Sequence, residues 1–495
     1  MNPDYWKEED EEKTIGWRDR HRSNDDDPIR GSVQKATDPA YEPATGTVKP
    51  VGNLGPYQAA VIFITNEIGI GILSLPAALQ VLGLIPGVIA IVGMGSLSLY
   101  TAYILVQFYR RYPHVVNMVD FGRVLGGRPL EFVFAVGFTI NLALICASAI
   151  ITISIGLNTI TEHAMCTVAF IAFPAILCFL LCVPRTMKFV SYCGWPCTVS
   201  IVTAVLIPMI ALGIGGPANV PDGEEVTFKI VGDPSFSEAV SAFLNIGFAF
   251  SGNQAFVTVL AEMRDPARDF TKAICIEKIF AIIMYSTVAI VCYVFAGDYV
   301  QSPAIGSAPV TIAKISYGII FVSLFGTGLV FGHTVIKYLF VFTMRHLAFV
   351  AKRRGRAPSV EANAMKRRQS QPHDSRSRTS WIVWIAIGAG YWILVFIIAN
   401  AIPVFDSLLN ISASLLLAWF TWGLPSVFWI HLNWNHLFDG WKKTALFCFN
   451  IFILGVTLFM NTAGMYASID SLLSTFADPD NNVDGPFTCG DNSIF

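Results

Sequence analysis

Glu67 is an acidic residue inside a long apolar stretch, beside two glycines and ahead of a proline. The stretch reads Ile-Thr-Asn-Glu-Ile-Gly-Ile-Gly-Ile-Leu-Ser-Leu-Pro over residues 64–76. An ionisable group among apolar residues costs free energy, so it is a candidate for function wherever it occurs in a membrane. We expect Glu67 to be the proton-coupling carboxyl, which takes up a proton from the outside and releases that proton inside. The alternative is that Glu67 only caps or neutralises a neighbouring group.

A second apolar stretch, residues 245–254, has the same character and reads Asn-Ile-Gly-Phe-Ala-Phe-Ser-Gly-Asn-Gln. Glycine destabilises a helix by about 1 kcal/mol relative to alanine, so both stretches have a weak point. A helix break in a membrane frees backbone groups, which a substrate can bind. Freed N–H groups suit a carboxylate and freed carbonyls suit an ammonium, so the pair favours a zwitterion. Packing of small residues between helices is the alternative.

Individual binding roles follow from this interpretation. We expect the carboxylate at the backbone of Asn66, Gly69 and Gly71, and the ammonium at the carbonyls of Gly247, Phe248 and Ala249 with the Ser251 hydroxyl. The predicted side-chain pocket comprises Phe138, Asn141, Phe248 and Phe250. An apolar or aromatic lining suits neutral substrates, because a charged side chain would need a partner. Apart from Glu67, the acidic residues of these segments are peripheral: Glu131, Glu238 and Glu262.

The elements that must position these residues are transmembrane helices. The chain has 495 residues, of which 54% are hydrophobic and only 14% charged, whereas a soluble domain carries about 25% charged residues. A transmembrane helix needs roughly 20 mostly apolar residues. The eleven predicted spans are residues 56–79, 87–109, 130–160, 166–183, 196–215, 237–261, 273–297, 312–343, 381–401, 405–430 and 444–468.

Basic residues mark alternate loops as cytosolic, since Lys and Arg concentrate on the inner side of a membrane. With the N-terminus inside, the basic inner loops are 110–128, 184–195, 262–278, 345–380 and the loop with Lys442 and Lys443. Only Lys229 and Lys314 fall outside. The predicted regions are therefore a disordered cytosolic tail (1–55), a transporter domain (56–468) and an extracellular C-terminal tail (469–495). The net charge of -2 gives no basic field for nucleic acid.

The two breaks lie five spans apart, which predicts two five-helix repeats and one appended helix. Because five is odd, the second repeat enters the membrane from the opposite side, as in inverted-repeat transporters. Cys166 and Cys489 both fall on the outer side, where a disulfide could form. The other cysteines lack the spacing of a metal site, and we expect no metal.

At these residues the chain resembles the amino acid/auxin permease family, and most closely its fungal neutral amino acid permease type. The similar stretches are Glu67–Pro76, Leu82–Gly87, Phe250–Gln254, Glu262–Phe270 and Lys337–Phe340, within a resemblance that spans about residues 50–470. The resemblance implies an all-α protein with eleven helices in a LeuT-like fold. It also implies proton-coupled uptake of amino acids, with the proton gradient as energy source, no cofactor, and sodium as the less favoured ion.

Lys337 and His333 lie four residues apart, so they share one face of the eighth predicted helix. In a LeuT-like fold this helix packs near a cation site beside the first segment. We expect both Lys337 and His333 to take part in proton or cation coupling, with the Lys337 ammonium in place of a sodium ion there. The alternatives are that Lys337 extends to the inner surface and that His333 is a hydrogen-bonded packing residue.

Other classes of function fit the sequence less well. An enzyme is not expected, because the chain has no P-loop, no histidine cluster and no large soluble domain. A non-transporting amino acid sensor on the same scaffold, or a carrier or exporter of an amino-acid-derived metabolite, stays open. The expected location is the plasma membrane, with the vacuolar membrane as the second choice. The expected partners are a small amino acid and lipid, and the sequence does not define the oligomeric state.

Overall fold

The computed structural model describes residues 54–492, apart from 113–114, 116–117, 186, 219, 222–224, 261–262, 354–377 and 478–484. Within this part of the chain all regular elements are helices, and the single β-bridge joins Leu54 to Met263. Most of the predicted N-terminal tail and of the basic loop 345–380 lies outside the described residues, as does Glu262.

The long helices follow the apolar stretches closely. They are α5 (Leu84–Arg111), α6 (Met118–Thr161), α8 (Met187–Gly215), α11 (Pro266–Ala296), α12 (Val310–Arg353), α14 (Arg378–Ala401) and α17 (Trp441–Ala477), with the shorter α7 (Thr167–Cys182). Helix α6 starts earlier than residue 130 because an N-terminal piece joins it across a kink at Gly126 and Gly127.

Eight helical segments of the described chain are long and apolar enough to cross a membrane. The other three predicted spans are α7, with 16 residues, and the two stretches with predicted breaks. The structure is therefore an all-helical membrane protein, while the count of eleven crossings stays a prediction.

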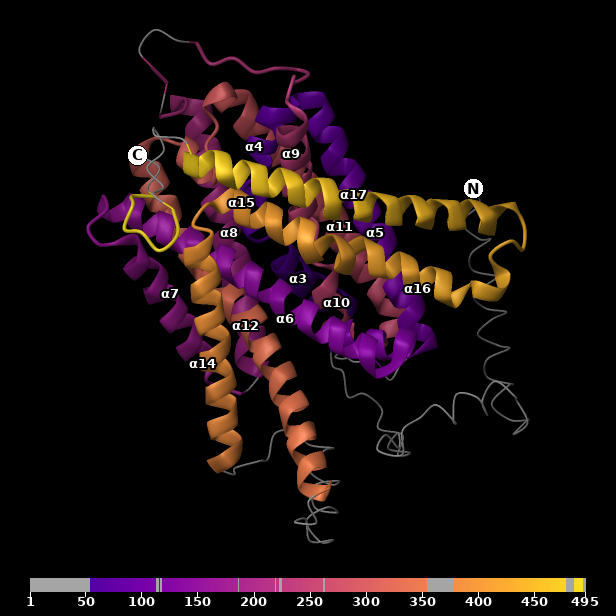
Figure 1. Ribbon diagram of the computed structural model, residues 1–495. Helices are drawn as coiled ribbons and strands as arrows, with labels where there is room; N and C mark the ends of the chain where they lie inside the picture. The colour runs from indigo at the N-terminus through magenta and orange to yellow at the C-terminus, as the bar shows by residue number, and fades with distance from the viewer. Residues whose placement is uncertain are drawn as a thin grey trace. The chain divides into compact units, whose positions relative to one another are not determined.

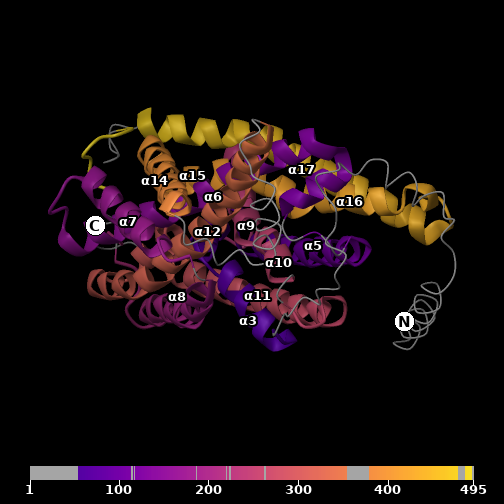
Figure 2. The same cartoon turned by 90° about the horizontal axis from the view of Figure 1, so that it is seen from below.

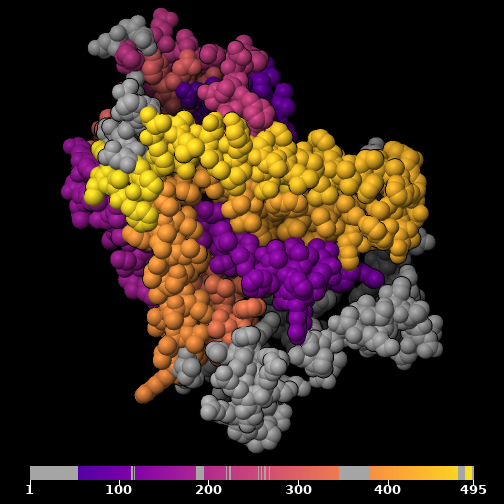
Figure 3. Space-filling view, in the orientation of Figure 1, coloured from indigo at the N-terminus to yellow at the C-terminus, as the bar shows by residue number. Residues whose placement is uncertain are grey.

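Helix α6 lies in the interior of this bundle and α17 lies at its periphery. In the most apolar window of α6, 89% of the residues are buried, against 22% in α17. Helix α12 packs along α6 and α8, whereas α17 runs beside α9 and α15 (Figures 1 and 2). The space-filling view shows α17 as a long outer ridge (Figure 3). Its exposed apolar side chains, such as Phe452 and Leu473, suit contact with lipid.

The tenth predicted span departs from regular α-helix. It comprises α15 (Phe405–Ser412), two π-helical turns, η4 (Ala413–Leu417) and η5 (Trp419–Gly423), and α16 (Leu424–Leu432). π-Helical turns are rare and frequently occur at functional sites. Both turns face the centre of the bundle, because η4 packs against α9 and η5 packs against α5 and α10.

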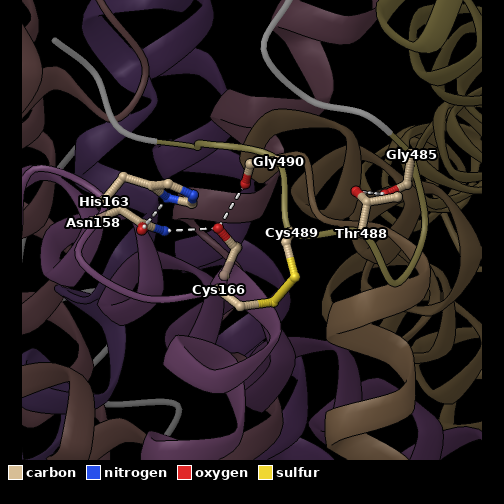
Figure 4. Close-up of a disulfide and its surroundings, with 8 residues drawn as sticks. Asn158, His163, Cys166, Gly485, Thr488, Cys489 and Gly490 are labelled. Carbon is tan, nitrogen blue, oxygen red and sulfur yellow. Dashed lines mark hydrogen bonds between the residues drawn. A yellow bond between two sulfur atoms is a disulfide. The ribbon is translucent and has the colours of Figure 1, made fainter.

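A disulfide joins Cys166, at the start of α7, to Cys489 in the C-terminal tail (Figure 4). The sequence analysis left this pairing open as a possibility, and the structure contains the bond. Hydrogen bonds tie the tail down around it: Thr167 Oγ donates to the Gly490 carbonyl at 2.6 Å, and Asn158 donates to Thr167 at 3.1 Å. The Phe487 N–H also donates to the carbonyl of Asn400 at the end of α14. The C-terminal tail is thus folded back onto α6, α7 and α14.

Candidate functional site

The first predicted break lies at Ile68 and Gly69. Helix α3 (Pro56–Glu67) ends at Glu67, and the next two residues leave helical geometry, with Gly69 at φ -133° and ψ -136°. The chain continues as a short 3-10 turn, η1 (Ile70–Leu73), and then as α4 (Leu75–Leu82). Two short helices thus share one apolar stretch, as the glycines and polar residues predicted.

The second predicted break lies at residues 250–252. Helix α9 (Phe236–Ala249) begins with a capping box, in which Ser235 and Glu238 bond each other's backbone N–H groups. It ends at Ala249, and α10 (Asn253–Leu260) follows after Phe250, Ser251 and Gly252. Both helix breaks are therefore confirmed.

The two breaks are in direct contact. A Cβ atom on Gly71 would lie only 2.6 Å from the Cα of Ala249, so glycine at this position allows the two backbones to meet. The Tyr285 hydroxyl, on α11, lies between the same segments. It is 2.7 Å from the Glu67 carbonyl and 3.1 Å from the Ala249 carbonyl. One tyrosine thus connects the end of α3 to the end of α9.

The Glu67 carboxylate is buried at this contact and forms an ion pair. Its Oε1 lies 2.5 Å from the Nζ of Lys278, and both side chains are fully buried. A Cβ on Gly252 would lie 1.9 Å from Glu67 Oε2, so the carboxylate fits only against a glycine of the second break. Glu67 therefore contacts three elements: its own break, the other break and α11.

Glu67 and Lys278 are at matching depths. Glu67 is eleven residues from Pro56 at the start of α3, and Lys278 is twelve residues from Pro266 at the start of α11. At 1.5 Å per residue both lie roughly 17 Å along their helices. This corrects the sequence analysis, which placed Lys278 in the inner loop 262–278.

A second buried acid completes the cluster. Glu277 Oε1 lies 3.7 Å from the Lys278 ammonium, and the Glu277 side chain is fully buried. Among the described residues, neither carboxylate oxygen of Glu277 has a hydrogen-bond partner. Two acids thus share one cation out of contact with water. Burial of a net charge is costly, so neutrality of this cluster requires one proton.

At the site predicted to bind the substrate carboxylate, some backbone N–H groups already donate to the protein and others do not. The backbone N–H groups of Ile70 and Gly71 donate to none of the described residues, as expected at the start of a helical turn. Gly69 donates to the Glu67 carbonyl at 3.0 Å. Asn66 is half-buried one residue before Glu67.

The predicted ammonium site is occupied by the protein's own donors. The Gly247 carbonyl accepts from the Phe250 N–H, and the Phe248 carbonyl accepts from both the N–H and the hydroxyl of Ser251. The Ala249 carbonyl accepts from Tyr285. A carbonyl oxygen has two lone pairs, so an added ammonium remains compatible with these bonds.

The predicted side-chain pocket residues are all buried but belong to different packing groups. Phe138 packs edge-on against Phe420 of η5 and Tyr338 of α12. Phe250 packs edge-on against Tyr285. Asn141 donates to Gln254, so it ties α6 to α10. Their assignment to a common pocket stays a prediction.

The two residues predicted on α12 lie elsewhere in the bundle. His333 Nε2 is 3.0 Å from the Pro184 carbonyl, and its ring packs edge-on against Trp384. These contacts fit the interpretation of His333 as a packing residue. Lys337 is half-buried one turn later. The ammonium in contact with Glu67 is that of Lys278, so a coupling role for Lys337 stays a prediction.

Sequence reasoning missed Lys278, Glu277 and Tyr285. A signal for the first two was present, because Glu277 and Lys278 fall inside the span predicted at 273–297. Intramembrane charges mark functional sites, and the same rule that selected Glu67 selects this pair. Tyr285 carries no such signal, since a tyrosine in an apolar helix is ordinary.

Paired broken helices around a buried ionisable cluster, within an all-helical apolar bundle, define a membrane transporter. Residues 52–469 match the family described as transmembrane amino acid transporter protein, and the chain belongs to that family.

Curated relatives and solved structures agree with this assignment. The chain is 30% identical to the N amino acid transport system protein of Neurospora crassa over 88% of each chain. It is 27% identical to a transmembrane transporter of Fusarium pseudograminearum, over 88% of this chain and 87% of that one.

Two solved structures share the fold at low sequence identity. A nucleobase-cation-symport-1 family transporter matches with a TM-score of 0.51 at 13% identity, over 88% of this chain and 94% of that one. A Na+-coupled sialic acid symporter matches with a TM-score of 0.50 at 12% identity, over 87% and 92%.

Proposed function

We propose that this chain imports neutral aliphatic and aromatic amino acids across the plasma membrane by proton symport. The observation that carries the proposal is the buried Glu67–Lys278 pair at the contact between the two helix breaks. Membership of an amino acid transporter family supports the class of substrate. The identity of the relative from Neurospora crassa, described as an N amino acid transport system protein, supports the choice of amino acids.

In the proposed mechanism the proton and the substrate act on the same contact. The N–H groups of Ile70 and Gly71, which donate to none of the described residues, bind the substrate carboxylate. The Glu67, Lys278 and Glu277 cluster holds one proton when it is closed off from water. When the cluster opens to the inner side, water solvates the carboxylates and the proton leaves. Lys278 supplies a fixed positive charge, so no sodium ion is needed beside Glu67.

The disulfide supports the proposed orientation. Cys166 and Cys489 both lie on the side assigned as extracellular, and disulfides persist in oxidising environments. The same side carries the Glu162–Lys314 ion pair at 2.7 Å, in which the Lys314 ammonium lowers the pKa of Glu162.

Uptake of labelled amino acids into permease-deficient yeast tests the proposal. We expect accumulation of leucine and phenylalanine that is faster at acidic pH, unchanged by removal of sodium, and abolished by a protonophore. Binding without accumulation would instead support an amino acid sensor on this scaffold. Efflux of an amino-acid-derived metabolite without uptake would support an exporter.

A further inference from the structure

A further acidic residue, Asp406, lies in the first turn of α15 and is not part of the cluster of Glu67, Lys278 and Glu277. Its Oδ1 accepts hydrogen bonds from the Ser302 hydroxyl at 2.8 Å and from the Asn245 side-chain amide at 3.4 Å. Both donors are neutral. Within the described part of the chain, no Lys or Arg forms an ion pair with this carboxylate.

Two further buried acceptor oxygens belong to side chains on α9 and α15, the two helices that meet at Asp406. Asn245 and Asn410 are 6% and 1% exposed, and the Oδ1 atom of each is buried with no hydrogen-bond partner among the described residues. Asn410 lies one turn after Asp406 on α15, so the two side chains share a helix face. Asn245 is on α9, which packs against α15. Buried acceptors without donors are costly, and each calls for an explanation.

The position of this group connects it to the substrate. Asn245 is two residues before Gly247, in the half of the broken segment that precedes the break. Ser302 lies in the loop between α11 and α12, on the side that the loop charges assign as extracellular. Asp406 and the Asn245 side chain bonded to it therefore lie on the side of the second break that is assigned as extracellular.

The chemistry of these atoms selects the ligand. All three oxygens accept hydrogen bonds, and Asp406 adds a negative charge, so the matching group is a cation with several N–H donors. We propose that Asp406, Asn245 and Asn410 form an outer subsite that binds the ammonium group of the incoming substrate. This inference rests on the proposed function, because a zwitterionic amino acid supplies that ammonium.

The ammonium that binds this subsite is either the α-ammonium or a side-chain ammonium, and a comparison of two substrates distinguishes them. The α-ammonium is common to all amino acids, whereas a side-chain ammonium occurs only in basic ones such as lysine. Isoamylamine has an ammonium and the leucine-like alkyl chain but no carboxylate, so it reports on the cation alone.

The test compares Asp406→Asn with the wild-type chain in permease-deficient yeast. Labelled leucine and labelled lysine are taken up at a range of concentrations, and isoamylamine is added as a competitor of leucine. A hydrogen-bonded charge pair contributes about ten- to a hundredfold in affinity. We therefore expect at least a tenfold rise in KM and loss of inhibition by isoamylamine, with little change in maximal rate. Asp406→Glu, which keeps the charge, restores part of both.

A matched control removes another acidic side chain from the same side. Glu162→Gln breaks an exposed ion pair far from the breaks in sequence, so it leaves KM and isoamylamine inhibition unchanged. Surface abundance of each variant is measured to separate folding from binding. If Asp406 only holds the loop in place, the maximal rate falls while isoamylamine still competes at its original concentration.

The outcomes separate this inference from the proposed function. A higher KM for leucine assigns the subsite to the α-ammonium, and an effect confined to lysine assigns it to a side-chain ammonium. Unchanged KM values and unchanged amine inhibition in Asp406→Asn, beside active wild-type uptake, overturn the inference. Absence of amino acid uptake by the wild-type chain overturns the proposed function itself.

Discussion

Lys278 is fully buried, and its positive charge is balanced by the carboxylates of Glu67 and Glu277. Removal of one partner from a buried ion pair leaves an uncompensated charge and typically costs 3–5 kcal/mol. Replacement of both partners costs much less. The energetics of Glu67 and Lys278 are therefore strongly coupled.

The first prediction is that Lys278→Met lowers the free energy of unfolding by about 3–5 kcal/mol, because Glu67 and Glu277 are left without their cation. The double variant Glu67→Gln with Lys278→Met recovers part of this loss. Thermal unfolding of the purified protein in detergent measures both. Additive losses in the double variant would show that the two side chains are not coupled.

At the level of single residues, sequence reasoning located one partner of the buried pair but not the other. Glu67 was identifiable because it interrupts an apolar run beside two glycines. Lys278 was assigned to a loop because its charge sits near the end of a span, where lysine normally reaches the surface. The hydroxyl of Tyr285 joins two carbonyls that are distant in sequence, so only the fold brings them together.

At the scale of elements, the contact between the two broken segments is controlled by small residues. Gly71 faces the backbone of Ala249, and backbone atoms of a packed helix cannot move aside without a larger rearrangement. The break itself was predictable from glycine and polar residues, whereas the contact of the two breaks depends on how η1 and α4 pack against α9.

The second prediction is that Gly71→Ala lowers the rate of amino acid uptake by about a hundredfold, the effect of a misplacement on the order of 1 Å at a reacting site. Initial rates of leucine uptake, normalised to surface abundance, measure this. Gly93→Ala on α5 is the control, since an added Cβ there meets no atom within 4 Å. Equal rates in the two variants would mean that the contact of the breaks has no part in transport.

The third prediction concerns Gly252. Its added Cβ would meet the Glu67 carboxylate at 1.9 Å, so Gly252→Ala displaces that carboxylate while the helices remain intact. We expect the ratio of the uptake rate at acidic pH to the rate at neutral pH to fall toward one, because the displaced carboxylate no longer lies where it pairs with Lys278. Uptake by Gly252→Ala with an unaltered pH profile would argue against Glu67 as the proton site.

The sequence pattern did not predict the π-helical turns of the tenth span. The sequence from Ala413 to Gly423 is apolar and aromatic, which predicts a plain helix. Trp422 packs within 3.2 Å of the position of a Cβ on Gly247, so this wide turn fits the aromatic ring against the second broken segment. Such local widening follows from packing between elements and leaves no periodic signal.

At the scale of the whole molecule, the C-terminal tail is part of the folded domain. The sequence predicted an extracellular C-terminal tail over residues 469–495. In the structure α17 continues to Ala477, and the disulfide joins Cys489 to the start of α7. The pairing of Cys166 with Cys489 was predictable only through topology, which placed both cysteines on one side of the membrane.

The fourth prediction uses this disulfide to test orientation. In intact cells, a membrane-impermeant maleimide labels Cys489→Ser at Cys166 but does not label that position in the wild-type chain, where Cys166 is bonded. Peptide mapping by mass spectrometry identifies the labelled residue. Labelling of Cys166 only after the cells are permeabilised would place this corner of the protein in the cytosol.

The central claim is that amino acid and proton move together through the contact at Glu67. The most direct measurement follows internal pH in proteoliposomes that contain the purified protein and a pH-sensitive dye. We predict that external leucine acidifies the interior without sodium, and that Glu67→Gln abolishes this acidification while leucine binding persists. Leucine entry without acidification in the wild-type protein, or equal acidification in Glu67→Gln, would contradict the account.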